Sequence, residues 1–254
     1  RLVEILTQEF FREARVNFLC DLEDEKVRQI QKQWVPKAPG LPWPALVERS
    51  ELIVEAASQE VALPIAQKAL EQDKQVLILS VGGLLTWNGL ALILEKTKGR
   101  LWIPSGALAG VDGLLAATQG GVRRVTLTTR KPHLGLKGAP YLRKNKIRLS
   151  AIKKPTLIFE GNAAEAIQAF PRNVNVAATL ALAGLGPRQT HVRIFTSPTY
   201  RANQHEVEIE GDFGRIRTEV ENLPSAANPR TSELAVLSSI ATLKKIFSRI
   251  RIGT

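Results

Sequence analysis

Three histidines are the side chains of this sequence that exchange protons most readily near neutral pH. His133 follows a proline in a glycine-rich loop and His191 starts a predicted strand, so we interpret both as bystanders. His205 follows the turn-like segment 201–204 and opens another predicted strand. A histidine at a strand entrance is more often a surface residue than a catalyst. His205 is nevertheless the candidate general acid or base of this chain.

A polar pair interrupts an apolar stretch near the middle of the chain. Residues 174–184 are almost all small and apolar, which predicts a buried helix. Asn175 and Thr179 are four residues apart and share one face of that helix. Buried polar side chains need hydrogen-bond partners, so this face either bonds the neighbouring backbone or contacts a ligand. Asn173, which follows Pro171, is the expected N-cap.

The first half of the chain alternates short apolar strands with helices. The expected strands are 16–21, 52–57, 75–82 and 100–106, and the expected helices are 2–11, 23–33, 59–72 and 87–98. This alternation predicts a parallel sheet covered on both faces.

Ligands of such sheets lie outside the carboxyl ends of the strands. Small or polar residues stand at those ends, among them Asp21, Ala57 and Ser80, which are therefore candidate cofactor contacts. Asp21 has two open interpretations, because an acid there can bond the ribose hydroxyls of a dinucleotide or cap the helix at 23–33.

One part of a dinucleotide-binding pattern is missing. A first strand and a G-x-G-x-x-G turn, which hold the pyrophosphate, should precede the helix at 2–11. The sequence begins at Arg1, and no other segment replaces that turn. We therefore expect either that residues precede Arg1 in the natural protein or that dinucleotide binding is damaged.

The pattern changes from Leu108 onward. Strands are expected at 123–131, 156–161, 191–197, 205–211 and 215–222, with helices at 108–118, 162–170, 174–184 and 231–247. Gly211 and Gly214 flank a hairpin signal between the last two strands. Four prolines within residues 34–44 predict a loop there. Strands in succession with helices between them favour an α+β domain with a mostly antiparallel sheet.

Composition excludes several classes of protein. The 254 residues contain one cysteine, Cys20, which excludes an internal disulfide and thiolate metal clusters and fits a reducing, cytoplasmic setting. No apolar run is long enough for a membrane span, and the histidines and carboxylates show no metal-ligand spacing. The net charge of +11 could indicate nucleic acid, but aromatic residues do not interleave the basic ones, so we expect no nucleic-acid partner. The basic residues that crowd one solvated segment are Arg143, Lys144, Lys146, Arg148, Lys153 and Lys154.

Several long motifs resemble one enzyme family. They are EAASQE (55–60), LILSVGGL (77–84), IPSGALAGVDG (103–113), TLTTRKP (126–132), IFEGNAAEAIQAFPRNVNVAATLALAG (158–184), the Asn-x-His-Glu of 203–206 and NPRTSELAVLS (228–238). From about Asp21 to the C-terminus the chain is similar to L-aspartate dehydrogenase.

The resemblance implies an α/β fold: a Rossmann-type NAD(P)-binding domain at 1–107, completed by the C-terminal segment 229–254, and a catalytic and dimerisation domain at 108–228. It implies a homodimer that oxidises L-aspartate to iminoaspartate with NAD or NADP and feeds NAD biosynthesis. The imine otherwise hydrolyses to oxaloacetate and ammonia.

The resemblance also assigns residues. His205 matches the family's catalytic histidine, and Ala107 and Asn175 match its NAD contacts. Thr179 can share the site by helix spacing. Because the substrate carries two carboxylates, it needs cationic partners, for which Arg130 and Lys131 at the end of a strand are candidates; an exposed charge pair is the alternative.

Two other functions compete with this one. The first is a related oxidoreductase for another substrate, such as a homoserine-dehydrogenase-like enzyme. The second is a non-catalytic homologue that kept the fold without the glycine-rich turn.

Overall fold

The computed structural model describes residues 1–85, 89–171, 175–225 and 231–254. The chain divides into two compact units, Arg1–Ile103 with Ile240–Arg249, and Pro104–Ser239 with Ile250–Thr254. The chain first passes from one unit to the other between Ile103 and Pro104, whereas the sequence predicted this boundary between residues 107 and 108. The expected N-cap, Asn173, lies outside the described residues.

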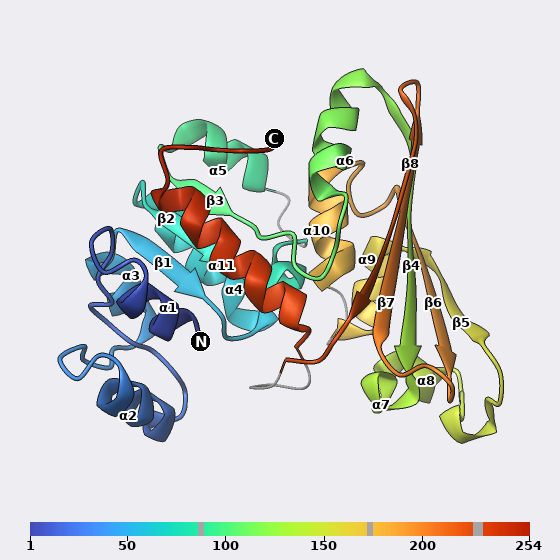
Figure 1. Ribbon diagram of the computed structural model, residues 1–254, viewed down its shortest axis with the longest axis horizontal. Coiled ribbons are helices and arrows are strands. Elements are labelled where there is room, and N and C mark those ends of the chain that lie inside the picture. Colours follow the sequence, from blue (N-terminus) through green and yellow to red (C-terminus); the bar gives the residue numbers. More distant parts are fainter. Residues whose placement is uncertain (86–88, 172–174, 226–230) are drawn as a thin grey trace. The chain divides into compact units, whose positions relative to one another are not determined.

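The first unit contains a three-stranded parallel sheet (Figure 1). Its order is β1 (Leu52–Glu55), β2 (Gln75–Ile78) and β3 (Arg100–Trp102), and both pairings are parallel. Helix α4 (Gln59–Glu71) connects the first two strands, and α5 (Leu90–Lys96) lies between the second and third in sequence. The prediction of alternating strands and helices in a parallel sheet is confirmed for residues 52–85 and 89–102.

Helices from both ends of the chain contribute to the core of this unit. Helix α1 (Leu2–Gln8) and the C-terminal helix α11 (Glu233–Phe247) supply buried side chains that cluster with Leu77 of β2. The buried members of this cluster are Ile5, Leu6, Phe10, Leu77 and Leu243. The rings of Phe10 and Phe247 lie 5.3 Å apart. Residues more than 230 positions apart in sequence are therefore packed together in the first unit.

The strand predicted at 16–21 is wrong. Leu19 makes a single β-bridge to Gly40 and belongs to no strand. A strand needs a continuous neighbour for its backbone donors and acceptors, and the loop at 39–41 satisfies only Leu19 in this way. Leu19 packs instead with Val27 of helix α2 (Asp24–Gln33) and Ala38.

A helix was missed after the proline-rich loop. Helix α3 runs over Trp43–Arg49, although its first residues lie within the segment predicted as a loop. Pro44 stands in its first turn. A proline is tolerated there because the N–H that it lacks would have no partner within the helix.

The second unit contains a five-stranded sheet in the order β5-β6-β4-β7-β8. The strands are β4 (Val122–Pro132), β5 (Thr156–Asn162), β6 (Thr190–Ser197), β7 (Asn203–Gly211) and β8 (Gly214–Asn222). Strands β4 and β6 are parallel and the other three pairs are antiparallel, which confirms a mostly antiparallel sheet. Gly211 pairs with Gly214 at the predicted hairpin.

Helices of the second unit lie against one face of this sheet (Figure 1). They are α6 (Val111–Ala117), α7 (His133–Leu136), α8 (Pro140–Lys144), α9 (Ala163–Ala169) and α10 (Asn175–Ala183). Gly113 of α6 lies close to Ile216 of β8, because a Cβ added at Gly113 would be 3.2 Å from the Ile216 side chain. Helix α6 therefore covers the face of the sheet on which Ile216 lies. Val220 lies on the same face, since side chains alternate along a strand. We call this the inner face and the opposite one the outer face.

Candidate functional site

Strand pairing brings the predicted catalytic histidine to the inner face. His205 pairs with Thr129 of β4 and with Val220 of β8. Strand β7 begins at Asn203, so His205 is its third residue rather than its first, and it is only 4% exposed. The interpretation of this position as a surface histidine at a strand entrance is therefore wrong.

Lys131 lies on the same face as His205. Side chains two residues apart on a strand share a face, so Lys131 is on the side of Thr129 and hence of His205. It is 7% exposed, which excludes the alternative of an exposed pair for this residue. A Cβ at Gly135 of α7 would lie 4.0 Å from Lys131 Cδ and 3.8 Å from Asn203 Oδ1. Helix α7 thus forms a wall beside both side chains.

The pKa values of both ionisable groups at this site are lowered. Burial lowers the pKa of Lys131 to about 8. Burial and then the nearby Lys131 charge lower the pKa of His205 to about 3, so this imidazole is neutral at pH 7. Burial acts on both groups because a low-dielectric environment disfavours a charged side chain, and for His205 the positive charge of Lys131 adds to it.

Thr129 orients the imidazole of His205. Its hydroxyl oxygen lies 3.0 Å from His205 Nδ1 in a buried contact. Since one ring nitrogen is engaged by Thr129, Nε2 is the nitrogen that can meet a substrate. Sequence reasoning missed Thr129 because its partner is 76 residues away. Asn203 belongs to the Asn-x-His-Glu motif, which did not indicate a role for it. Its spacing of two residues from His205 is the signal that places both side chains on one face of the sheet.

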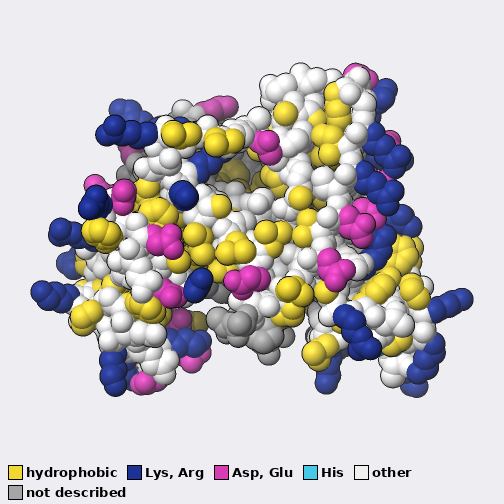
Figure 2. Space-filling view, in the orientation of Figure 1, with side chains coloured by type: hydrophobic (Ala, Val, Ile, Leu, Met, Phe, Trp, Pro, Cys, Tyr) yellow, Lys and Arg dark blue, Asp and Glu magenta, His cyan; other side chains and the backbone are white. Residues whose placement is uncertain are grey.

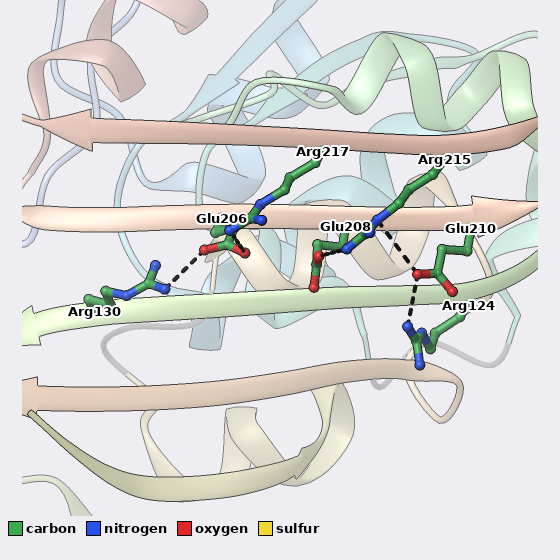
Figure 3. Close-up of polar contacts among 7 residues, drawn as sticks. All are labelled: Arg124, Arg130, Glu206, Glu208, Glu210, Arg215 and Arg217. Atoms are coloured by element: carbon green, nitrogen blue, oxygen red, sulfur yellow. Dashed lines mark hydrogen bonds and ion pairs between the residues drawn. The ribbon is translucent and has the colours of Figure 1, made fainter.

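Arg130 lies on the outer face, away from His205. Its guanidinium pairs with Glu206 at 2.9 Å, and Arg217 pairs with the other oxygen of Glu206 at 2.9 Å. Farther along the sheet, Arg215 bonds Glu208, and Arg124 pairs with Glu210 at 2.9 Å (Figure 3). The structure therefore does not bring the two predicted substrate cations together.

The outer face forms an ordered series of opposite charges. In Figure 2 dark-blue side chains, with magenta ones among them, gather on the right side of the view, where Figure 1 draws this sheet. Glu206 is 6% exposed between its two arginines, so its charge is compensated where water is largely excluded.

The three remaining predicted residues of this unit occupy different environments. Thr179 is 4% exposed within α10, and the prediction of a buried helix is confirmed for its central residues. Asn175 begins the helix and is exposed. Ala107 is 5% exposed, and its carbonyl accepts a hydrogen bond of 3.2 Å from Asn222 Nδ2 at the end of β8. Their contacts with a ligand stay predictions.

The predicted contacts of the first unit lie near its strand ends, with one exception. Ala57 follows β1 and is exposed, and Ser80 follows β2 and is half-buried. Asp21 is exposed and ends no strand, and its Oδ1 accepts from the Glu23 N–H at 3.0 Å, just before α2. The N-cap of α2 is Glu23, so Asp21 does not cap the helix and only bonds the backbone of the N-cap residue. A bond from Asp21 to ribose stays a prediction.

Two searches concern other classes of site. Within the part of the chain that the structure describes, no group of three or more His, Cys, Asp or Glu side chains could hold a metal ion. A search of the same residues finds no helix long and apolar enough to cross a membrane.

Arg143, Lys146 and Arg148 line a surface pocket of about 490 Å³ in the basic segment.

Comparison with known proteins decides the family. Residues 112–246 match the model "Aspartate dehydrogenase, C-terminal", and residues 1–104 match "Homoserine dehydrogenase, NAD binding domain". The L-aspartate dehydrogenase of Methanosarcina barkeri is 44% identical over 247 residues, which cover 95% of this chain and 90% of the relative. The chain belongs to the aspartate dehydrogenase family.

Other relatives of the family agree. The L-aspartate dehydrogenase of Methanosarcina mazei is 45% identical over 249 residues, which cover 95% of this chain and 91% of that one. A crystal structure of aspartate dehydrogenase from Thermotoga maritima superposes with a TM-score of 0.70 at 24% identity, covering 94% of this chain and 100% of that chain. This superposition and the NAD-binding model confirm the predicted fold class.

Proposed function

We propose that this protein oxidises L-aspartate to iminoaspartate with NAD or NADP, the activity for which its relatives are named. The imine then hydrolyses to oxaloacetate and ammonia, unless a following reaction of NAD biosynthesis consumes it. Membership of the family supports the reaction. The observation that carries it in the structure is the buried group on the inner face, where Lys131 and His205 lie beside each other with Thr129 on the imidazole.

The first unit supplies residues that fit a dinucleotide. Its parallel strands end in small or polar residues, Ala57 and Ser80, that allow a ligand to approach the backbone. Asp21 is the candidate for a ribose hydroxyl, and Ala107 and Asn175 of the second unit are the contacts that the family motif assigns. A nicotinamide dinucleotide held by these residues would supply the acceptor for the hydride that leaves Cα of aspartate.

Lys131 is the proposed partner of a substrate carboxylate. Aspartate brings two carboxylates, and a buried ammonium binds such a group strongly because water screens little of the attraction. Thr179 is a further candidate contact from the helix that covers this face. Arg130 remains a candidate from the sequence, although its pairing with Glu206 on the outer face favours Lys131.

His205 is the proposed acid–base group. The ammonium of aspartate must lose a proton before a hydride can leave Cα, and hydrolysis of the imine requires an activated water. The neutral imidazole can accept a proton at Nε2 in either step while Thr129 holds Nδ1. A bound dianion offsets the Lys131 charge, which is one of the two causes of the low pKa, and makes the imidazole a stronger base.

A homodimer is part of the proposal. The outer face carries both signs of charge in a regular series, so a second copy could meet it with complementary charges across a twofold axis. The mass in solution, measured by light scattering, distinguishes a dimer from a monomer. A cytoplasmic setting also belongs to the proposal, since a single cysteine suits a reducing compartment.

The direct test is aspartate-dependent formation of NADH or NADPH. We expect absorbance at the reduced-nicotinamide band with L-aspartate, with oxaloacetate and ammonia as products, and far slower rates with homoserine and other amino acids. Faster turnover of homoserine would favour the homoserine-dehydrogenase-like alternative. Cofactor binding without turnover of any amino acid would favour a non-catalytic homologue.

A further inference from the structure

A buried glutamate joins the ends of two parallel strands in the first unit. Glu55, the last residue of β1, is 3% exposed. Its Oε1 accepts from the Ala57 N–H at 2.7 Å and from the Ser80 hydroxyl at 2.8 Å. Its Oε2 accepts from the Ser80 N–H at 3.0 Å. One carboxylate therefore connects the two residues that the sequence independently indicated as cofactor contacts.

The carboxylate is stabilised by hydrogen bonds rather than by an ion pair. Among the residues that the structure describes, no basic side chain lies within salt-bridge distance of Glu55. Three donors and the adjacent start of α4, whose N-cap is Ser58, offset the cost of burying its charge. A carboxylate so placed accepts hydrogen bonds and donates none.

The two loops that carry these donors are also packed closely together. A Cβ at Gly83, in the turn after β2, would lie 2.2 Å from the carbonyl oxygen of Gln59 in the first turn of α4. Any larger residue at Gly83 would force the loops apart. The segments after β1 and β2 are therefore closely packed as well as joined by hydrogen bonds through Glu55.

The hydrogen bonds of Glu55 determine what this edge can offer a ligand. They occupy the Ala57 N–H, the Ser80 N–H and the Ser80 hydroxyl hydrogen, which are donors that would otherwise suit a phosphate. The hydroxyl oxygen of Ser80 donates its hydrogen to Glu55 and can still accept a hydrogen bond. Ser80 is half-buried, and the small residues Ala56 and Ala57 are exposed. The edge consequently presents hydrogen-bond acceptors over a buried negative charge.

We propose that Glu55 is a positioning residue that makes the Ser80 edge a subsite for a ribose hydroxyl of the dinucleotide and not for its phosphates. Glu55 fixes the Ser80 hydroxyl hydrogen inward, so the Ser80 oxygen accepts from a ribose hydroxyl. The inference rests on the proposed function for the identity of the ligand as a dinucleotide.

The test measures NADH binding by fluorescence titration, without aspartate. Glu55→Gln cannot accept all three hydrogen bonds and places an amide donor against a donor, so the Kd for NADH should rise about tenfold. Ser80→Ala removes the proposed acceptor and should cause a similar rise, and the double variant should be no worse than about either single one because both act through one contact. Glu51→Gln, an exposed acid just before β1, is the matched control and should bind as the unsubstituted protein does.

A second readout separates positioning from a loss of folding. At saturating cofactor, the KM for L-aspartate and kcat of Glu55→Gln should stay within about twofold of the unsubstituted values, while the KM for the cofactor rises. Unchanged NADH affinity in both Glu55→Gln and Ser80→Ala would overturn the inference, and so would an equal rise in both KM values. If NADH affinity depends on Glu55 but aspartate is not oxidised, the inference holds and the proposed function fails.

Discussion

The two faces of the five-stranded sheet use similar side chains in opposite ways. Arg130 and Lys131 are neighbours in β4, and strand alternation sends them to different faces. On the outer face Arg130 is paired with Glu206, so its charge serves an ordered ion-pair series. On the inner face burial lowers the pKa of Lys131 and the Lys131 charge in turn lowers that of His205.

The two faces thus separate side chains that can take part in a reaction from charges that pair with one another. Charges on the outer face are paired with opposite charges of the same sheet, so a small anionic ligand would gain little there. Ionisable groups held out of water on the inner face are in an unfavourable environment that an anionic substrate relieves. Perturbed pKa values in one cluster are therefore a better indication of function than the number of charges.

Replacing each of the two cations in turn should give the largest difference between the faces. Lys131→Met should lower kcat/KM for L-aspartate about 100-fold, because the buried ammonium is the proposed carboxylate partner. Arg130→Met, the matched control one residue away, should lower it less than about threefold. Equal losses in steady-state kinetics would contradict the assignment of the two faces.

The outer face should respond in stability instead of activity. Glu206→Gln leaves two guanidinium groups without their carboxylate and should lower the free energy of unfolding by about 2 kcal/mol, discounted because Arg217 is mostly solvent-exposed. Glu219→Gln, on the neighbouring strand and exposed, should change it by less than about 0.5 kcal/mol. Urea unfolding measures both, and an effect of Glu206→Gln confined to kcat would show that the outer face takes part in the reaction.

The lowered pKa of His205 predicts a pH-dependent effect on stability. The unfolded chain binds a proton on this histidine below its ordinary pKa of 6.5, and the folded protein does so only near pH 3. Stability is therefore lost as pH falls from 6.5 toward 3, by about 1 kcal/mol per pH unit. His205→Asn should remove this contribution, so the difference between the two proteins should shrink or reverse at low pH.

His191 provides the control for that measurement. It is more exposed and its ring lies 3.0 Å from Glu160. His191→Asn should therefore not reproduce the effect. Identical pH profiles for the unsubstituted protein and His205→Asn would mean that His205 titrates normally.

Local sequence patterns predicted the elements that depend on nearest neighbours. The apolar runs of β1, β2 and β3 and the Gly211–Gly214 hairpin have signals within a few residues, and each was found. The segment 16–21 has a similar run of apolar residues, yet it forms no strand because strands depend on a partner that the local pattern does not show.

The site was predictable only in part for the same reason. Family motifs indicated His205, but its burial and its contact with Thr129 follow from the register of β4 and β7, which the sequence alone does not determine. Glu55 was overlooked because it lies within the expected strand LIVEAA (52–57), whose local pattern does not show which groups contact it. Its three donors come from Ala57 and Ser80, which only the folded sheet brings together.

The most direct test of the account is the rate of aspartate-dependent NAD(P)H formation in His205→Ala, with folding checked by circular dichroism. The account predicts that kcat falls at least about 100-fold while the fold is retained, because the proton of the substrate amine or of the attacking water loses its acceptor. A folded His205→Ala protein that oxidises L-aspartate at a near-normal rate would contradict it.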